Sequence, residues 1–236
     1  MSVLNHSPSI VRNGLILCLD AGAVQSYAGS GSTWYNLTSN EKNGAINNAT
    51  HNSNGYFDFD GSNDNISVAD HSTLDVTGDM TLSCWVALGS SENGNLCMLV
   101  NKRDDGDTSS PYYIFFEDRS GQNKYGALLG GGSPNYVVVG SNDNFDGVYD
   151  KWDYVCLTVS GTTVSLYING VFDDSGTFTG SRQTNNVALK IGGPYTDGST
   201  NYMMDGKIAN VSMYNKALTA VEVKQNYNTH KGRFGK

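Results

Sequence analysis

Two acidic stretches of the chain have residue types that could bind a cation. The first, YFDFDGSNDNISV at residues 56–68, contains Asp58, Asp60 and Asp64 together with two asparagines. Such oxygen-rich side chains suit calcium, but Asp and Asn also hydrogen-bond the local backbone in turns. The stretch has no glutamate to close an EF-hand loop. We therefore interpret it as two strands joined by a turn at residues 61–63.

The second acidic stretch, NKRDDGDTSS at residues 101–110, places Asp104, Asp105 and Asp107 around Gly106. It connects two apolar segments that we expect to be strands. Neighbouring carboxylates in a loop are commonly just solvated, whereas a bound calcium ion would relieve their mutual repulsion. This segment alone leaves both interpretations open.

The sequence contains no recognisable catalytic constellation. Glycoside hydrolysis needs two positioned carboxylates. Glu117 and Asp118 are adjacent in an expected strand and so point to opposite faces, and Glu222 has the position of a helix-capping residue. The four histidines lie in polar or terminal stretches, no G-x-S-x-G motif occurs, and no His/Cys spacing suggests zinc. The segment GALLGGGSPN lacks the Lys-Ser/Thr of a phosphate-binding loop. We expect a protein that is not an enzyme.

Some aromatic side chains could form a sugar-binding surface. Tyr195 and Tyr202 lie outside the expected strands, and Tyr112 stands at the start of one. Flat rings can pack against the apolar faces of sugars, and the same rings can cap the open edge of a hydrophobic core. We take these three tyrosines as candidate ligand-binding residues and assign Trp34 to the core.

The overall charge restricts the class of partner. The 236 residues carry a formal net charge of −8, and the sequence pI is about 4.8. A phosphate backbone needs a basic footprint, so this acidity argues against nucleic acid and against anionic membrane surfaces. No apolar run reaches the roughly 18 residues of a membrane helix. Uncharged polar ligands and cations are compatible with this charge, which also favours solubility.

The cysteines indicate reduced thiols. Cys18, Cys84, Cys97 and Cys156 each lie within an apolar run, and none forms a C-x-x-C pair. That is the setting of buried thiols that pack as small hydrophobic groups. Because the start of the chain also lacks the pattern of a signal peptide, we expect a protein that is made in a cytoplasm and is not exported through an oxidising compartment.

Short apolar or alternating segments recur along most of the chain and predict strands. Gly, Asn, Asp and Ser separate them, which is typical of a β-sandwich or barrel. Asn169-Gly170 after the alternating segment TVSLYI predicts a hairpin with a type I′ turn. In YFDFD the phenylalanines should face the core and the aspartates the other side. The expected strands occupy residues 14–20, 56–60, 65–68, 80–88, 96–102, 112–118, 125–130, 136–140, 152–159, 163–168, 187–192 and 207–214.

One helix is predicted near the end of the chain. In LTAVEVKQNYNTHKG, Thr219 and Glu222 have the spacing of a capping box, and Leu218 and Val223 that of a hydrophobic staple. Gly232 is the expected residue just past the helix end. The helix should pack on the outside of the sandwich.

Several of these segments together resemble a known family. FDFDGSNDNISV, MTLSCWV, WDYVCLTVSGTTVSLYINGV and DGKIANVSMYNKALTAVEVKQNY occur in the order found in laminin-G-like domains of the concanavalin A-like lectin/glucanase superfamily. The resemblance covers nearly the whole chain and implies one domain over residues 1–236. Its implied fold is all-β, a two-sheet antiparallel jelly-roll sandwich with a short C-terminal helix. It also implies binding rather than catalysis, because the acidic strand motif of the glucanase branch is missing.

The resemblance extends to the calcium-binding pentraxins of the same superfamily. LVNKRDDGD followed by YYIFF looks like their first ligand segment, which implies Asp104 and Asp105, and KIGGPYTD looks like the second, which implies Asp197. The Glu and Gln ligands of the pentraxin loop are missing here. With Asp107 from the acidic stretch, these residues form our candidate calcium site.

Both ends of the chain resemble laminin-G-like domains in structural proteins of tailed bacteriophages. The segments are YAGSGSTWYNLTSN near the start and NYNTHKGRFG at the end. This resemblance implies a virion surface protein assembled in the host cytoplasm. Two roles stay open: a non-catalytic carbohydrate-binding or adhesion domain for a glycan such as a bacterial surface polysaccharide, and a capsid or tail decoration protein that contacts other virion subunits. Either role is compatible with a homo-oligomer, and a glycoside hydrolase would need the carboxylate pair that the sequence lacks.

Overall fold

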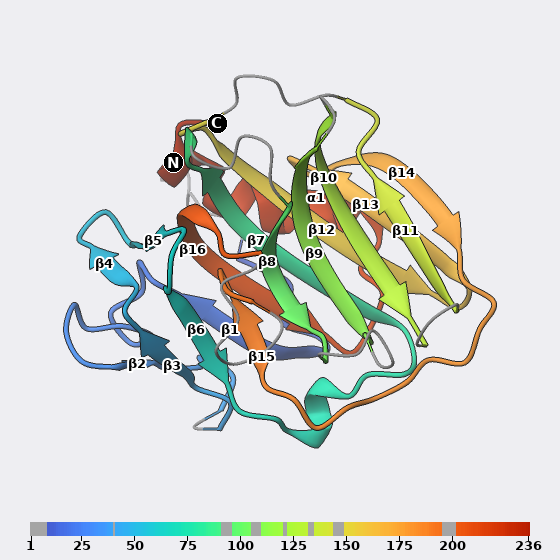
Figure 1. Cartoon of the computed structure of the whole chain (residues 1–236), viewed down its shortest axis with the longest axis horizontal. Helices are drawn as coiled ribbons and strands as arrows, with labels where there is room; N and C mark the ends of the chain where they lie inside the picture. Colours follow the sequence, from blue (N-terminus) through green and yellow to red (C-terminus); the bar gives the residue numbers. More distant parts are fainter. Residues whose placement is uncertain are drawn as a thin grey trace, which may run out of the picture.

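The chain forms a sandwich of two antiparallel β-sheets with one α-helix on its outside (Figure 1). This computed structural model describes residues 9–39, 41–90, 96–104, 110–119, 122–131, 135–143, 149–194 and 202–236. Over these residues the two-sheet sandwich and the C-terminal helix that the sequence predicts are confirmed. No helix in these ranges is both long and apolar enough to cross a membrane.

The first sheet has the strand order β14-β13-β12-β7-β16-β5-β4, and β1 also pairs with β16. Its strands are β1 (Leu15–Asp20), β4 (Thr50–Asn52), β5 (Tyr56–Asp60), β7 (Met80–Leu88), β12 (Trp152–Ser160), β13 (Thr163–Ile168), β14 (Val171–Thr177) and β16 (Asp205–Tyr214).

The second sheet has the order β11-β10-β9-β8-β15-β6-β3-β2. Its strands are β2 (Thr33–Trp34), β3 (Gly44–Asn47), β6 (Asn65–Val68), β8 (Leu96–Lys102), β9 (Tyr112–Arg119), β10 (Gln122–Gly130), β11 (Tyr136–Gly140) and β15 (Leu189–Ile191). A short 3-10 helix, η1 (Ser72–Leu74), follows β6.

Alternating side chains along both sheets form the main core between them. In β5, Phe57 and Phe59 are buried, while Asp58 is half-buried and Asp60 is exposed. This alternation follows from the two-residue period of a strand. Trp34, which the sequence assigns to the core, is fully buried there.

The acidic stretch at residues 56–68 is a strand, a turn and a second strand, as predicted. Gly61 has a φ of 74°. The Ser62 N–H donates to Asp60 Oδ1 over 2.8 Å, and the Asp60 N–H donates to Asp64 Oδ2 over 3.0 Å. Burial raises the pKa of the Asp64 carboxyl, and the hydrogen bond from the Asp60 backbone opposes that rise. The carboxylates of Asp60 and Asp64 therefore stabilise the turn by bonding its backbone.

The predicted hairpin is also present between β13 and β14. Asn169 and Gly170 have φ values of 53° and 72°, and a type I′ turn requires positive φ at both positions. The Asn169 side chain accepts a hydrogen bond from the Tyr154 N–H over 3.1 Å. The turn is thereby fastened to the neighbouring strand β12.

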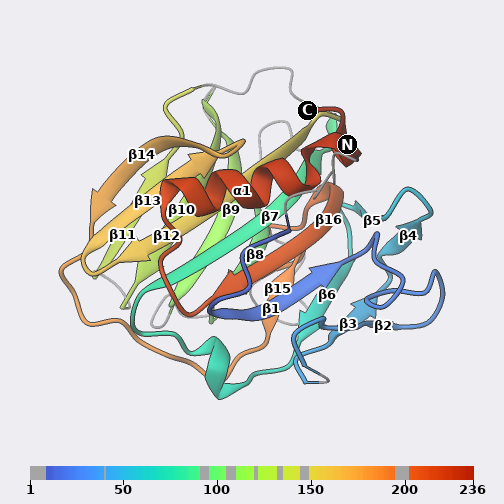
Figure 2. The same ribbon diagram turned by 180° about the vertical axis from the view of Figure 1, so that it is seen from behind.

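The helix α1 (Ala220–His230) lies across the outer face of the first sheet (Figure 2). Thr219 and Glu222 form the predicted capping box. Val223 and Tyr227 pack with Trp85 in a second apolar cluster between helix and sheet, to which β7, β12 and β13 contribute. The amphipathic helix therefore covers a face that would otherwise be an exposed apolar surface.

The end of the helix differs from the prediction. A 3-10 helix, η3 (Lys231–Phe234), continues the path of α1, and the left-handed residue is Gly235, with a φ of 69°, rather than Gly232. The extra turn brings the Phe234 ring onto Trp85, with ring centroids 4.4 Å apart. This aromatic contact stabilises the continued helical path.

Candidate functional site

The pairing of β16 brings two loops together at one edge of the first sheet. β1 pairs with residues 210–214 of β16, and β5 pairs with residues 205–208 on the same edge. Ala21, just after β1, donates its N–H to the Ala209 carbonyl over 2.9 Å. The loop that leaves β1 therefore emerges beside the turn that enters β5, although some 30 residues separate them in the sequence.

The loop after β1 is ordered by the buried side chain of Ser26. Its hydroxyl donates to the Tyr35 carbonyl over 2.6 Å and accepts from the Asp20 N–H over 3.1 Å. The Tyr27 hydroxyl donates to the Gly31 carbonyl over 2.9 Å. These bonds hold residues 21–35 as a defined loop rather than a free one.

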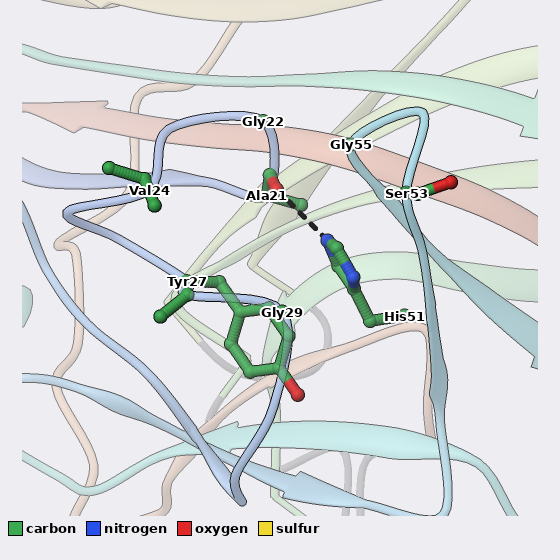
Figure 3. Close-up of a pocket in the computed structure, with 9 residues that line it drawn as sticks. Ala21, Gly22, Val24, Tyr27, Gly29, His51, Ser53 and Gly55 are labelled. Atoms are coloured by element: carbon green, nitrogen blue, oxygen red, sulfur yellow. Dashed lines mark hydrogen bonds between the residues drawn. The ribbon is translucent and has the colours of Figure 1, made fainter.

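The opposite side of the site is β4, which carries His51. The His51 Nε2–H donates to the Ala21 carbonyl over 3.0 Å and so joins β4 to the loop (Figure 3). The His51 ring lies beside the Tyr27 ring, with centroids 4.6 Å apart, and both rings pack on Phe57 beneath them. The two rings are thus positioned by the core.

A charged pair lies behind the wall of the site. Arg233 Nη1 is 2.6 Å from Asp20 Oδ1, and Arg233 Nη2 donates to the Gly55 carbonyl. The Gly22 N–H donates to the same Asp20 oxygen over 2.9 Å. A Cβ on Gly22 would stand 2.4 Å from the guanidinium carbon, and a Cβ on Gly55 would stand 2.7 Å from the Gly22 Cα. Glycine at both positions therefore allows this close packing.

These elements line an open pocket of about 410 Å³. We name it the Tyr27–His51 pocket. Its volume lies within the range of roughly 300–1,000 Å³ that is usual for small-ligand sites. Among the residues that the structure describes, its lining includes the half-buried His51 ring, the largely buried Tyr27 ring, Ser53 and three glycines, and it includes no Asp, Glu, Lys or Arg. The described residues that line it are Ala21, Gly22, Val24, Tyr27, Ala28, Gly29, His51, Ser53 and Gly55.

The candidate residues from the sequence lie elsewhere. Tyr112 is fully buried in the main core and donates its hydroxyl proton to the Leu74 carbonyl over 2.8 Å. Its assignment as a ligand-binding residue is therefore wrong, because no surface ligand can reach its ring. Tyr202 is half-buried, and its carbonyl accepts from the Met98 N–H over 3.0 Å.

The candidate calcium ligands are described only in part. Asp104 is half-buried just after the end of β8. Tyr202 pairs with Met98, near the other end of that strand. Asp105, Asp107 and Asp197, together with Tyr195, lie outside the described residues. Within the ranges that are described, no three His, Cys, Asp or Glu side chains come close enough to hold a metal ion.

Sequence reasoning missed the pocket because its parts carry no motif. His51 stands in a polar segment, and Tyr27 lies 24 positions earlier in the glycine-rich segment AGAVQSYAGSGS. Only the shared edge of β16 brings them together. The one signal available was that glycine-rich segment directly after a predicted strand, which is typical of a loop with close backbone packing.

A family model described as "Concanavalin A-like lectin/glucanases superfamily", of the laminin G type, matches residues 60–224 of the chain. The chain belongs to this superfamily. The residues that line the Tyr27–His51 pocket precede the matched segment. A comparison with curated protein sequences finds no match.

Solved structures confirm the superfamily fold. The botulinum neurotoxin serotype D binding domain has a TM-score of 0.69 at 15% identity, covering 91% of this chain and 51% of that one. The binding domain of Paraclostridial Mosquitocidal Protein 1 has a TM-score of 0.70 at 17% identity, covering 92% and 52%. A Trypanosoma rangeli sialidase has a TM-score of 0.68 at 17% identity, covering 100% and 37%. This concanavalin A-like chain thus spans about half or less of the length of those proteins, and the likeness concerns the fold.

Proposed function

We propose that the chain is a non-catalytic carbohydrate-binding domain and that the Tyr27–His51 pocket is its sugar site. The observation that carries the proposal is an open pocket of about 410 Å³ whose lining includes two rings and uncharged polar groups, on a lectin-type sandwich. Small-ligand sites commonly combine ring faces with a few fixed polar groups. A sugar presents both an apolar ring face and hydroxyls, which match these two kinds of wall.

The polar groups of the pocket suit hydroxyls. Because His51 Nε2 donates to the Ala21 carbonyl, the other nitrogen of a neutral ring, Nδ1, is an acceptor. The Ser53 hydroxyl can donate or accept, and Gly29 is exposed at the rim, where no side chain covers its backbone. Each sugar hydroxyl needs such a mixture of donors and acceptors.

The walls of the pocket support binding rather than hydrolysis. A glycosidase needs two carboxyl groups on either side of the bond that it cleaves. The described lining residues include no carboxyl group. The carboxylate behind the wall, Asp20, is already paired with Arg233 at 2.6 Å.

The proposed setting is the surface of a phage virion, assembled in a host cytoplasm, with a bacterial surface polysaccharide as ligand. The support is the resemblance of both ends of the chain to phage structural proteins, together with four buried free cysteines, which suit a reducing compartment. Calcium stays part of this proposal, with Asp104, Asp105, Asp107 and Asp197 as its ligands.

A second candidate role is that of a virion decoration protein. Four apolar side chains are exposed on β11 and β14, the edge strands that lie side by side opposite β4 (Figure 1). Exposed apolar groups gathered on one edge are typical of protein contacts. Such a contact would give a homo-oligomer or join other virion subunits. The side chains are Tyr136, Val138, Val171 and Phe172, each about half exposed or more.

The test is binding of the labelled protein to a panel of bacterial surface polysaccharides, once in calcium and once in EDTA. Saturable binding in either condition supports the lectin. Binding lost in EDTA, and lost equally in an Asp104→Ala, Asp105→Ala double variant, adds the calcium site. No binding in either condition contradicts the carbohydrate proposal. Sedimentation of the same sample then tests the decoration role, which predicts a definite oligomer.

A further inference from the structure

We propose that the Tyr27–His51 pocket selects uncharged sugar units and discriminates against carboxylated or sulfated ones, and that the Asp20–Arg233 pair determines this selectivity. The inference rests on the proposed carbohydrate binding and names the chemical class of the ligand. It follows from where the charges around the pocket lie.

The walls of the pocket offer only neutral groups among the residues that the structure describes. Peptide groups, the Ser53 hydroxyl and the His51 ring can replace the water around a sugar hydroxyl. They cannot compensate the much larger cost of dehydrating a carboxylate or sulfate, which needs a cation or several charge-assisted donors. An anionic sugar unit would therefore lose its bound water in the pocket without gaining interactions of equal strength.

The cation next to the pocket is already paired. The Arg233 guanidinium lies directly behind Gly22 and Gly55, close enough that a Cβ on either glycine would meet it. One of its nitrogens is 2.6 Å from Asp20 Oδ1 and another donates to the Gly55 carbonyl. Asp20 thus cancels, at contact distance, the charge that could attract an anion through the thin glycine wall.

The net charge of the chain also disfavours anionic ligands. The chain carries a formal net charge of −8, which repels anionic polymers at low salt. Besides Arg233, Asp20 meets the ring of His230, whose Nε2 is 3.6 Å from Asp20 Oδ2. Asp20 is therefore the residue whose charge keeps the back of the pocket neutral.

The substitution Asp20→Asn tests this role directly. The amide oxygen can still accept from the Gly22 N–H and from Arg233, but the Arg233 charge is no longer cancelled. We expect the wild type to bind a neutral polysaccharide at least tenfold more tightly than the same polymer oxidised at its primary hydroxyls to uronate. Asp20→Asn should reduce that ratio at least threefold.

Two further variants keep the test decisive if Asp20→Asn does not fold. Ser53→Lys places a cation at the exposed rim and should also reduce the ratio. Asp143→Asn changes the net charge equally but lies after β11, at the opposite edge of the sheets, and should leave the ratio unchanged.

The outcomes separate the two proposals. If the wild type binds neither polymer, carbohydrate binding itself is wrong, and the selectivity with it. If the wild type binds both equally, the lectin stands and the selectivity is overturned. If Asp143→Asn changes the ratio as much as Asp20→Asn or Ser53→Lys, the discrimination comes from net charge, and the role of Asp20 is overturned.

Discussion

Asp20 and Arg233 are 213 positions apart in the sequence, yet their side chains meet at 2.6 Å. Asp20 ends β1, and Arg233 lies in η3 after the C-terminal helix. Arg233 also donates to Gly55, before β5, and Asp20 accepts from Gly22. One ion pair therefore joins the two loops of the Tyr27–His51 pocket to the segment that follows α1.

The close packing at Gly55 can be tested by adding one methyl group. Gly55 has a φ of 84°, and its Cβ would be 2.7 Å from the Gly22 Cα. Gly29 has a φ of 90° but open space around it. Gly29→Ala should cost only the strain of a positive φ, on the order of 1–3 kcal/mol. We expect Gly55→Ala to cost about 1–3 kcal/mol more by urea unfolding, because of crowding. Equal losses would show that the close approach is unimportant.

His230, which lies beside the Asp20–Arg233 ion pair, should make the stability of the fold depend on pH. Burial lowers the pKa of His230 below its ordinary 6.5; Asp20 opposes this effect and Arg233 reinforces it. The unfolded chain therefore binds this proton more readily than the folded chain, so stability should fall as the pH drops from about 6.5 through the lower folded pKa.

The variant His230→Gln removes that contribution. Its free energy of unfolding should decline less between pH 7 and pH 5 than that of the wild type. His71→Gln, which removes a histidine outside this cluster, is the matched control. Parallel curves for the wild type and His230→Gln would contradict the prediction.

A buried lysine at the end of β8, in the second sheet, bonds to two other segments of the chain. Lys102 is fully buried, and its Nζ is 2.7 Å from Asp70 Oδ1, 3.3 Å from Asp75 Oδ1 and 2.8 Å from the Asn185 carbonyl. Lys102→Met would leave carboxylates without their cation, so we expect a loss of about 3–5 kcal/mol in the free energy of unfolding.

The control for Lys102 is an exposed pair of similar geometry. Lys207 lies 2.6 Å from Asp150, whose side chain is largely exposed. Lys207→Met should cost no more than about 1 kcal/mol, because water screens the pair. A loss of similar size in both variants would mean that burial of Lys102 does not matter.

The four cysteines should be unreactive until the protein unfolds. All are buried and free. Burial raises the pKa of Cys18 to about 11 and of Cys156 to about 12, and that of Cys84 still further. Since the thiolate is the reactive form, Ellman's reagent at pH 8 should label no thiol in native buffer and four in denaturant. Rapid native labelling would contradict this.

The fold could be predicted where the sequence has strong periodicity. β7, β8, β11 and β13 begin and end where the apolar or alternating segments do, and the hairpin at Asn169-Gly170 and the capping box at Thr219 are local motifs with one common geometry. The strands β2, β3, β4 and β14 were not predicted. They are short or rich in polar residues, and their pairing partners rather than their own pattern make them strands.

The site could not be predicted because its contacts are long-range. His51 and Tyr27 meet only because β1 and β5 pair with one edge of β16. Tyr112 illustrates the converse. A tyrosine at the start of a strand is as compatible with a surface as with a core, and its burial depends on which face β9 turns inward. Local spacing carries no information on either point.

The central claim, a sugar site at the Tyr27–His51 pocket, is tested most directly by the affinity of one His51 variant pair for a polysaccharide that the wild type binds. His51→Leu removes the bond to the Ala21 carbonyl and the polar edge of the ring, whereas His51→Gln keeps an N–H donor on a side chain of similar reach. Both are first checked for an unchanged fold by circular dichroism. We predict that His51→Leu weakens binding at least tenfold in calorimetry and that His51→Gln weakens it no more than about threefold, since 1.4 kcal/mol corresponds to a factor of ten. Wild-type affinity in a folded His51→Leu protein would contradict the account.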